Sequence, residues 1–301
     1  MSSATPSVRP SSEPVPMPAR ESWFPLLELA LQEDLGDRGD ITSDAVFGDD
    51  DRTRVAIEAR EPIVSCGLEL AQIVFETLAA DTTFEAHFRD GDRAAGGSDL
   101  ATIEGRTRPI LAAERTALNF LARLSGIATF TRRFVDEVAG TRALIVDTRK
   151  TLPGWRALDK YAVACGGGTN HRFGLYDGVM IKDNHVAAAG GTAQAVAAAR
   201  AAAPAGLEIQ VEVESLRDAH VAADAGADLL MLDNRTVPEL REIVAALGDR
   251  IPLEATGGVT LESVRAIAET GVHRISIGAL THSAPNVDIG LEVRDDARTA
   301  R

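Results

Sequence analysis

The sequence predicts an α/β protein in which an open or incomplete α/β barrel follows an N-terminal α+β domain. From residue 141 onward, short apolar runs end in polar or glycine residues and alternate with helical patterns, at a spacing of about 20 to 25 residues. Before that point, strand-like and helix-like segments follow one another in mixed order, which is typical of α+β proteins. Six strand and helix units are visible where a complete barrel has eight, so the barrel is incomplete, and a doubly wound open sheet is the alternative.

The N-terminal part begins with residues 1–20, whose Ser and Pro content and lack of an apolar core predict a disordered tail rather than a signal peptide. Apolar spacing then predicts a helix over 23–35 that ends at Gly36. Pro109 suits the first turn of a helix over 110–126, which Gly126 is expected to stop before a second helix over 128–138. The remaining elements of this part are a capped turn at 39–43, strands over 54–60, 83–88 and 100–105, a helix over 68–79 and a turn at 91–99.

The barrel part is expected to contain six buried strands joined by helices of ordinary length. The strands are predicted over 143–146, 178–181, 208–213, 229–232, 252–254 and 274–277. The helices between the later strands are predicted over 192–203, 216–225, 237–246 and 261–269. The expected domain boundaries are 21–128 together with 288–301 for the N-terminal domain, and 129–287 for the barrel.

Composition excludes several classes of function. The 301 residues carry a formal net charge of −14 and a pI near 4.9, which argues against a nucleic-acid partner because such proteins present a basic face. No run of 18 apolar residues is present, so no membrane span is expected. Cys66 and Cys165 lack disulfide-framework or zinc spacing, which favours free thiols in a reducing cytoplasm.

Cationic residues gather in one stretch, 144–185, which also holds all three lysines of the chain. Its two apolar runs end in the polar segments 147–150 and 182–185, and a glycine-rich loop between them ends in His171 and Arg172. Parallel strands deliver their carboxyl ends to the same edge of a sheet, so we expect these side chains to meet. In a protein this acidic, such a cluster predicts a pocket for an anion with several charges.

Carboxylates and glycines follow the later strands. Glu212 and Glu214 share a face by strand alternation, and Glu212 lies deeper, so it is the better functional candidate, whereas Glu214 is equally well explained as a helix cap. A cap would explain an acidic residue such as Asp233 after one strand, but six polar strand ends at one mouth favour a site. Glycines at 257–258 and 278 end the last two strands, where barrels often offer backbone N–H groups to phosphate. His185 and His282 have no metal-ligand spacing, which favours packing or hydrogen bonding.

These residues belong to a series of ordered motifs that resembles the quinolinate phosphoribosyltransferase family, also called nicotinate-nucleotide pyrophosphorylases (carboxylating). The resemblance runs from about Ala30 to Val293 and rests on the segments ALQEDLGDRGDIT, AERTALNFLARLSGIAT, DTRKTLPGWRALDKYAVACGGGTNHR, IKDNH, VEVES, LDN, LEATGGV and ISIGALTHS. Three departures are Trp155 where an aliphatic residue is usual, Asp159 where Glu is usual, and Thr256 where Ser is usual. None changes a charge in the expected pocket.

The resemblance implies transfer of the phosphoribosyl group of phosphoribosyl pyrophosphate to the ring nitrogen of quinolinate. The products would be nicotinate mononucleotide, pyrophosphate and CO2, a step in making NAD. It also implies an open α/β barrel, Mg2+ as cofactor, and a homodimer or larger assembly with shared sites. The implied substrate-binding residues are Arg115 of the neighbouring subunit, Thr148, Arg149, Lys150, His171, Arg172, Lys182, Glu212, Asp233, Thr256, Gly257, Gly258, Gly278, Ala279 and Leu280.

Within that set the resemblance assigns separate roles. Arg149, His171, Arg172 and Lys182 would meet the two carboxylates of quinolinate, and Lys150 would take phosphate. Glu212 and Asp233 would face the ribose and its Mg2+, and with Lys150 they are the expected catalytic residues. Two rival functions stay open: a barrel that only binds a phosphorylated metabolite, and a transferase that takes nicotinate directly.

Overall fold

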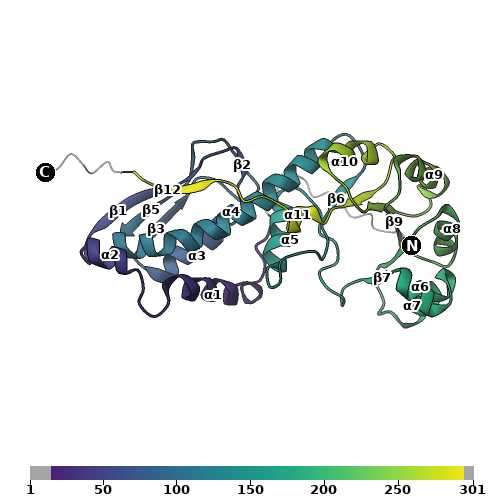
Figure 1. The fold of residues 1–301 in the computed structure, drawn as a ribbon, viewed down its shortest axis with the longest axis horizontal. Helices are drawn as coiled ribbons and strands as arrows, with labels where there is room; N and C mark the ends of the chain where they lie inside the picture. Colours follow the sequence, from purple (N-terminus) through teal and green to yellow (C-terminus); the bar gives the residue numbers. More distant parts are fainter. Residues whose placement is uncertain (1–14, 295–301) are drawn as a thin grey trace. The chain divides into compact units, whose positions relative to one another are not determined.

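The computed structural model of the chain describes residues 15–294, which divide into two compact units (Figure 1). Of the described residues, 15–129, 157–167 and 284–294 form the first unit, and 130–156 and 168–283 form the second. The expected disordered tail, 1–20, lies outside the described residues up to position 14, and its last residue begins the short 3₁₀ helix η1 (Arg20–Ser22). The predicted domain boundaries stay a prediction.

The first unit is built on an antiparallel sheet in the order β12 (Ile289–Val293), β1 (Arg52–Ala59), β5 (Ser98–Arg106) and β3 (Thr83–Ala86). The strand β1 is therefore central, and it pairs with a strand near the end of the chain, Val55 opposite Val293. Its other elements are α1 (Phe24–Leu35), α2 (Ile41–Val46), β2 (Ile63–Val64), α3 (Leu68–Leu78), β4 (Arg93–Ala94), the first part of α4 (Thr107–Glu137) and α5 (Arg156–Cys165).

Helix α4 corrects one prediction, because it runs without a break where two helices were expected. A Cβ atom added to Gly126 would collide with the backbone oxygen of Pro285. The glycine therefore allows the segment before β12 to pass close to the helix, which is a packing role and not a stop signal. Intrinsic propensity alone could not distinguish these two uses of glycine.

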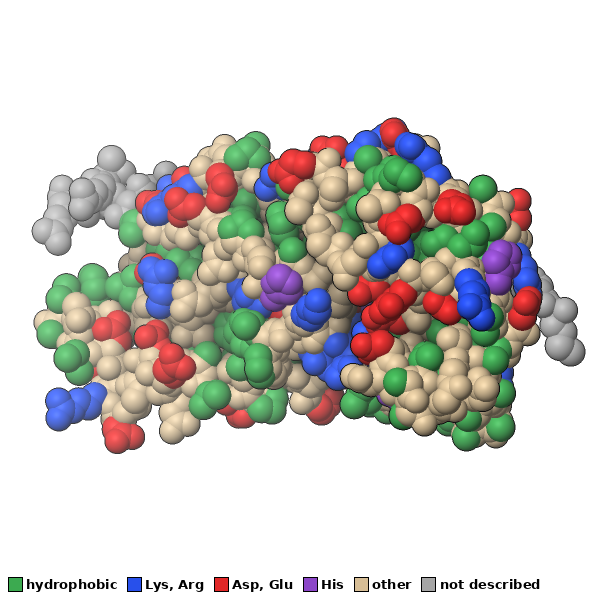
Figure 2. Space-filling view, turned by 45° about the vertical axis from the view of Figure 1, so that its right-hand side comes forward, with side chains coloured by type: hydrophobic (Ala, Val, Ile, Leu, Met, Phe, Trp, Pro, Cys, Tyr) green, Lys and Arg blue, Asp and Glu red, His purple; other side chains and the backbone are tan. Residues whose placement is uncertain are grey.

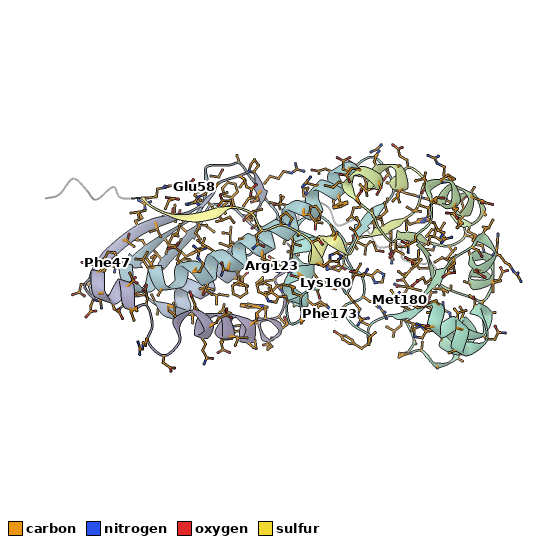
Figure 3. The ribbon with its side chains drawn as sticks, viewed as in Figure 1. Phe47, Glu58, Arg123, Lys160, Phe173 and Met180 are labelled. Carbon is orange, nitrogen blue, oxygen red and sulfur yellow. The ribbon has the colours of Figure 1, made fainter. Side chains whose placement is uncertain are left out.

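Two buried features tie α5 to the rest of the first unit. Arg123 of α4, labelled in Figure 3, contacts Asp159 through bonds of 2.9, 3.0 and 3.2 Å, and the Asp159 side chain is fully buried. The free thiols of Cys66 and Cys165 are also buried, and burial together with their proximity raises the pKa of Cys66. Neither contact was predicted, because α5 was missing from the expected elements.

The second unit contains a parallel six-stranded sheet, which confirms the open α/β barrel. The strands follow the order β6 (Leu144–Val146), β11 (Arg274–Ser276), β10 (Leu253–Thr256), β9 (Leu229–Asp233), β8 (Ile209–Val213) and β7 (Val179–Ile181). All neighbouring pairs are parallel, and no order reversal separates β7 from β11, as a doubly wound sheet would require. Within the described residues, β6 and β7 are the two edges, so the barrel is open between them.

One or two helices follow each strand of this sheet from β7 to β11 along the chain (Figure 1). They are α6 (Asp183–Ala189), α7 (Thr192–Ala202), α8 (Leu216–Asp224), α9 (Val237–Leu247), α10 (Leu261–Ala268) and α11 (Ala279–His282). Ser215 caps α8 by accepting from the Asp218 N–H, and Thr236 with Glu239 forms a capping box on α9. These caps place each helix start directly after a strand end, which leaves the strand ends available to a site.

The surface mixes charges of both signs. Figure 2 shows Asp and Glu side chains interspersed with Lys and Arg over the visible face, in keeping with the net charge of −14. Among the described residues, no helix combines the length and the apolar character that a membrane crossing needs.

Candidate active site

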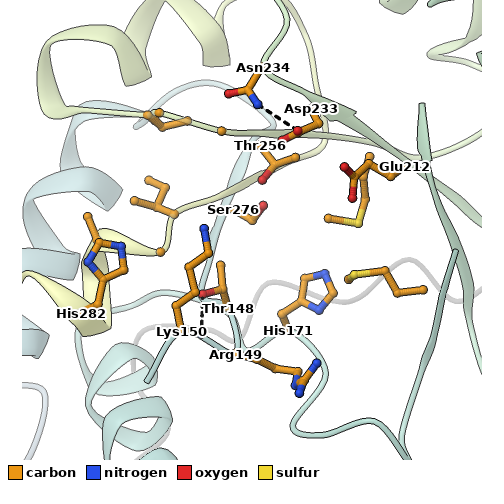
Figure 4. A pocket seen from close by; sticks show the side chains of 18 of the residues that line it. Thr148, Arg149, Lys150, His171, Glu212, Asp233, Asn234, Thr256, Ser276 and His282 are labelled. Carbon is orange, nitrogen blue, oxygen red and sulfur yellow. Dashed lines mark hydrogen bonds between the residues drawn. The ribbon is translucent and has the colours of Figure 1, made fainter. Parts of the chain in front are cut away.

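A cavity of about 800 Å³ opens at the carboxyl ends of the parallel strands, entirely within the second unit (Figure 4). All but two of the residues predicted for the site line it. They are Thr148, Arg149, Lys150, His171, Arg172, Lys182, Glu212, Asp233, Thr256, Gly257, Gly258, Gly278 and Ala279. The prediction that polar strand ends meet at one mouth therefore agrees with the geometry.

Strand register explains why these side chains converge. Glu212 of β8 pairs with Met231 of β9, and Met231 pairs with Glu254 of β10. Paired residues in adjacent strands point to the same face, so these three side chains form one level of the barrel interior. Asp233 and Thr256, each two residues further along, pair with each other and form the level at the mouth.

The cationic wall comes from β6, β7 and the loop before β7. Arg149 and Lys150 follow β6 and are exposed to the cavity, and Lys182 follows β7. Arg172 donates to the Gly178 carbonyl at 2.9 Å and to Met180 Sδ at 3.5 Å. Burial, together with the nearby charge of Arg149, lowers the pKa of Arg172. Cations that are partly desolvated and repel one another favour an anionic guest.

The carboxylate wall lies on β8 and β9. Glu212 Oε2 lies 2.6 Å from Lys182 Nζ, and Asp233 Oδ2 accepts a hydrogen bond of 2.9 Å from Asn234 Nδ2. Glu214 is exposed and does not line the cavity; helix α8 is capped by Ser215 and not by Glu214. The choice of Glu212 over Glu214 is therefore the one that the geometry supports.

The floor of the cavity contains a histidine held on two sides. The backbone N–H of His171 donates to Asp147 Oδ1 at 2.8 Å, and Asp147 is fully buried. The His171 Nδ1 atom accepts from the Arg172 N–H at 2.8 Å, so the ring proton lies on Nε2, which is 3.5 Å from Glu254 Oε1. Glu254 is also fully buried. His171 therefore meets the cavity as an oriented ring whose nitrogens both face protein groups.

The glycines at the mouth of the cavity allow neighbouring side chains to lie close to the backbone. Gly257 and Gly258 have φ angles of +94° and +60°, in the left-handed region that favours glycine. A Cβ atom added to Gly278 would lie 2.9 Å from Lys150 Cδ and 3.1 Å from His282 Nε2. Glycine at 278 thus lets the β11 end approach both side chains.

Two predicted residues lie elsewhere. Leu280 of α11 has a fully buried side chain and does not line the cavity. Arg115 lies on α4 in the first unit and is exposed. It makes no hydrogen bond or ion pair within the described residues. Burial raises the pKa of the neighbouring Glu114, and the charge of Arg115 offsets only part of that rise.

Both units match one protein family along most of the chain. Residues 40–125 match the profile described as the N-terminal domain of quinolinate phosphoribosyl transferase, and residues 127–292 match its C-terminal domain. The chain belongs to the quinolinate phosphoribosyl transferase family.

Individual members of this family cover nearly the whole chain. The nicotinate-nucleotide pyrophosphorylase [carboxylating] of Mycobacterium leprae is 44% identical, over 89% of this chain and 95% of its own length. The mitochondrial quinolinate phosphoribosyltransferase [decarboxylating] 2a of Nicotiana tabacum is 40% identical, over 96% and 88%. The structure of the nicotinate-nucleotide pyrophosphorylase from Francisella tularensis superimposes with a TM-score of 0.88 at 34% identity, covering 94% of this chain and 99% of that one.

Some polar residues line the cavity but were not among the site residues predicted from the sequence. Asn234, Ser276 and His282 all line the cavity, and each directly follows or ends a barrel strand or the α11 turn. Asn234 was recognisable as part of a polar strand end, but its uncharged amide gave no reason to assign it a role beside Asp233. His282 was judged by metal-ligand spacing, and its Nδ1 lies 2.6 Å from Ser283 Oγ, consistent with the hydrogen bonding expected for it.

Proposed function

We propose that this chain is a nicotinate-nucleotide pyrophosphorylase (carboxylating), which converts quinolinate and phosphoribosyl pyrophosphate to nicotinate mononucleotide, pyrophosphate and CO2 for NAD synthesis. The observation that carries the proposal is one cavity with cations on one wall and two carboxylates on the other, in a member of this family. The predicted barrel, 129–287, is the catalytic domain, because every residue lining this cavity falls within it.

Quinolinate is proposed to lie against the cationic wall. Its two carboxylates need more than one cation, and Arg149, Arg172 and Lys182 all reach the cavity. Arginine presents a planar fork that matches a carboxylate, and the lowered pKa of Arg172 reflects a desolvation cost that a bound anion offsets. The His171 ring, fixed from both sides, offers the aromatic guest an oriented surface.

Phosphoribosyl pyrophosphate is proposed to span the rest of the mouth. Lys150 and the backbone around Gly257, Gly258, Gly278, Ala279 and Leu280 offer positive charge and close approach to its phosphates. Breaking the bond from C1 of the ribose to pyrophosphate leaves positive charge on the sugar ring, which Glu212 and Asp233 stabilise. The ring nitrogen of quinolinate then supplies the electron pair for the new bond to C1, so no covalent enzyme intermediate is needed.

The carboxylates also suit the proposed Mg2+ cofactor. Mg2+ prefers hard oxygen ligands and usually takes one or two carboxylates together with substrate phosphates. Glu212 uses Oε2 toward Lys182 and Asp233 uses Oδ2 toward Asn234, so each retains a second oxygen for a cation or for ribose hydroxyls. When bound, the ion offsets negative charge on the leaving pyrophosphate.

Decarboxylation follows from the transfer. Once its nitrogen is bonded to the ribose, the ring nitrogen is cationic, and it stabilises the electron pair that stays on C2 when the bond to the 2-carboxylate breaks. CO2 leaves, and C2 takes up a proton. The cationic wall keeps the remaining carboxylate in place during this step.

The decisive assay combines the purified protein with quinolinate, phosphoribosyl pyrophosphate and Mg2+. We expect equimolar nicotinate mononucleotide, pyrophosphate and CO2, measured by chromatography, a pyrophosphate assay and release of label from the 2-carboxylate. Binding of the substrates without any product would instead support the binding-only rival. Nicotinate in place of quinolinate should be turned over far more slowly, because the cation surplus suits two carboxylates; equal turnover would favour the nicotinate rival.

A homodimer with shared sites is part of the proposal. Arg115 is exposed and makes no ion pair in the described chain, which suits a residue that completes the cavity of a second subunit. Mixing Arg115→Ala chains with Lys150→Ala chains tests this. Half of the randomly re-paired dimers are mixed, and one of their two cavities has both residues intact, so about a quarter of wild-type activity should return. No recovery after verified subunit exchange would place Arg115 outside the neighbouring site.

The cytoplasm is the proposed compartment. Cys66 and Cys165 are both free thiols, which suits a reducing environment. Cell fractionation with an antibody against the chain would show where it resides, and recovery with membranes or in an organelle would contradict the assignment.

A further inference from the structure

Asn234 has an unusual backbone conformation at the mouth of the cavity. It follows β9 directly, and among residues 15–294 it is the one non-glycine residue with a positive φ, +52°. Most side chains avoid this left-handed region because Cβ crowds the following carbonyl, and asparagine tolerates it better than most. A position that combines this strain with a cavity location points to a functional constraint.

The conformation places two groups of Asn234 against fixed partners. Its backbone N–H donates to the Thr256 carbonyl at 2.9 Å, which extends the β9–β10 pairing by one residue. Its Nδ2 donates to Asp233 Oδ2 at 2.9 Å, a contact drawn as a dashed line in Figure 4. The backbone of Asn234 is therefore fixed by β10, and its side chain binds the carboxylate of the preceding residue.

Gly257 shows that the neighbouring strand end is shaped around this side chain. A Cβ atom at residue 257 would collide with Asn234 Oδ1, and Gly257 itself has a φ of +94°. Any residue other than glycine would strain the backbone at 257 and displace the asparagine. The ends of β9 and β10 thus interlock, with the solvent-exposed Asn234 amide lying between Asp233 and Gly257.

We infer that Asn234 is a positioning residue that holds the Asp233 carboxylate in the orientation needed for the ribose of phosphoribosyl pyrophosphate. The inference rests on the proposed function, in which Asp233 faces the ribose and its Mg2+. An amide donor on Oδ2 fixes the plane of the carboxylate and leaves Oδ1 as the oxygen for substrate or cation. An acidic residue at 234 would have the same shape but would repel Asp233.

Three substitutions separate the amide from the backbone conformation. Asn234→Gly removes the amide and relieves the backbone, Asn234→Ala removes the amide and keeps the strain, and Asn234→Asp keeps the shape but removes the donor. Loss of a hydrogen bond to a charged group corresponds to roughly a tenfold to hundredfold change in affinity. We expect all three to raise KM and Kd for phosphoribosyl pyrophosphate in the presence of Mg2+ by at least about tenfold, with the Kd for quinolinate unchanged.

Substrate binding and thermal stability of the Asn234 variants are measured separately from activity. Titration calorimetry gives both Kd values, and thermal melting should show Asn234→Gly at least as stable as Asn234→Ala. If Asn234→Gly fails to fold, Asn234→Asp carries the test, because aspartate also tolerates the left-handed region. Asn234→Gly or Asn234→Asp with wild-type Kd and KM for phosphoribosyl pyrophosphate would overturn the inference.

The Gly257 side of the interlock gives a second, independent readout. Gly257→Ala should weaken binding of phosphoribosyl pyrophosphate, and combining it with Asn234→Gly should weaken binding by less than the product of the two single effects, since the collision is removed. Strictly multiplicative effects would contradict the interlock. A wild-type protein that binds phosphoribosyl pyrophosphate but yields no nicotinate mononucleotide would defeat the proposed function while leaving these binding comparisons valid.

Discussion

Lys182 should be needed for activity and dispensable for folding. Its Nζ lies 2.6 Å from Glu212 Oε2, and 47% of its side chain is exposed. An exposed ion pair contributes under about 1 kcal/mol to stability, and a loss of that size lowers Tm by roughly 2–4 °C in a domain of 150–250 residues. Lys182→Ala should therefore melt within about 4 °C of the wild-type protein.

Activity should respond far more strongly. A charge-assisted contact to an anionic substrate is worth about 1.5–3 kcal/mol, which corresponds to roughly a tenfold to 150-fold change. The substitution also leaves Glu212, whose side chain is 16% exposed, without its neighbouring cation, so this carboxylate would repel anionic substrates. We expect kcat/KM for quinolinate to fall at least about a hundredfold, and Lys150→Ala to lower kcat/KM to a similar extent.

Arg250→Ala is the matched control. Arg250 Nη2 lies 2.6 Å from Asp224 Oδ1, the two side chains are 50% and 67% exposed, and neither residue lines the cavity. Its removal should cost no more stability than that of Lys182 and should leave steady-state kinetics unchanged. If Lys182→Ala instead loses its folded state while the remaining folded molecules keep wild-type kcat/KM, the lysine is structural and its assignment to the cavity is refuted.

Two further predictions concern the first unit. Gly126→Ala should lower the free energy of unfolding by about 1–2 kcal/mol, because overpacking against Pro285 outweighs the roughly 1 kcal/mol gain in helix propensity. A variant that unfolds in urea with wild-type or higher stability would contradict this expectation. Asp159→Asn should lower the free energy of unfolding by about 3–5 kcal/mol, because it leaves the Arg123 guanidinium, whose side chain is 16% exposed, without its buried partner. Asp224→Asn, in an exposed ion pair, should lower it by under about 1 kcal/mol. Equal losses of stability in the same assay would show that burial does not set the cost.

The barrel strands were predictable because each is an apolar run that ends in a polar residue. The strand predicted over 229–232 is β9 (Leu229–Asp233), and the one predicted over 208–213 is β8 (Ile209–Val213). The same pattern exposed the site, since Lys150, Glu212 and Asp233 each stand at or next to such an end. A parallel sheet converts this one-dimensional pattern directly into a common edge.

Features that depend on contacts between distant segments were not predictable in this way. Helix α5 is buried on nearly every side, Asp159 and Lys160 included, so its polar residues do not mark a solvent-facing side as they do in a surface helix. Gly126 reads as a helix stop until Pro285 is seen to pass beside it. The role inferred for Asn234 likewise depends on Gly257, a residue of the next strand, and on a φ angle that the sequence does not reveal.

The pairing of β12 with β1 joins two segments that lie far apart in the sequence. The central strand of the first sheet has one edge occupied by β5 and the other by residues 289–293, more than 200 positions later. During synthesis that edge of β1 stays unpaired until residues 289–293 have been made, and an unpaired strand edge is a template for association with other chains. The first sheet therefore completes its pairing only after the strands of the second unit have been made, and until then its solubility depends on how well the open edge of β1 is protected from other chains.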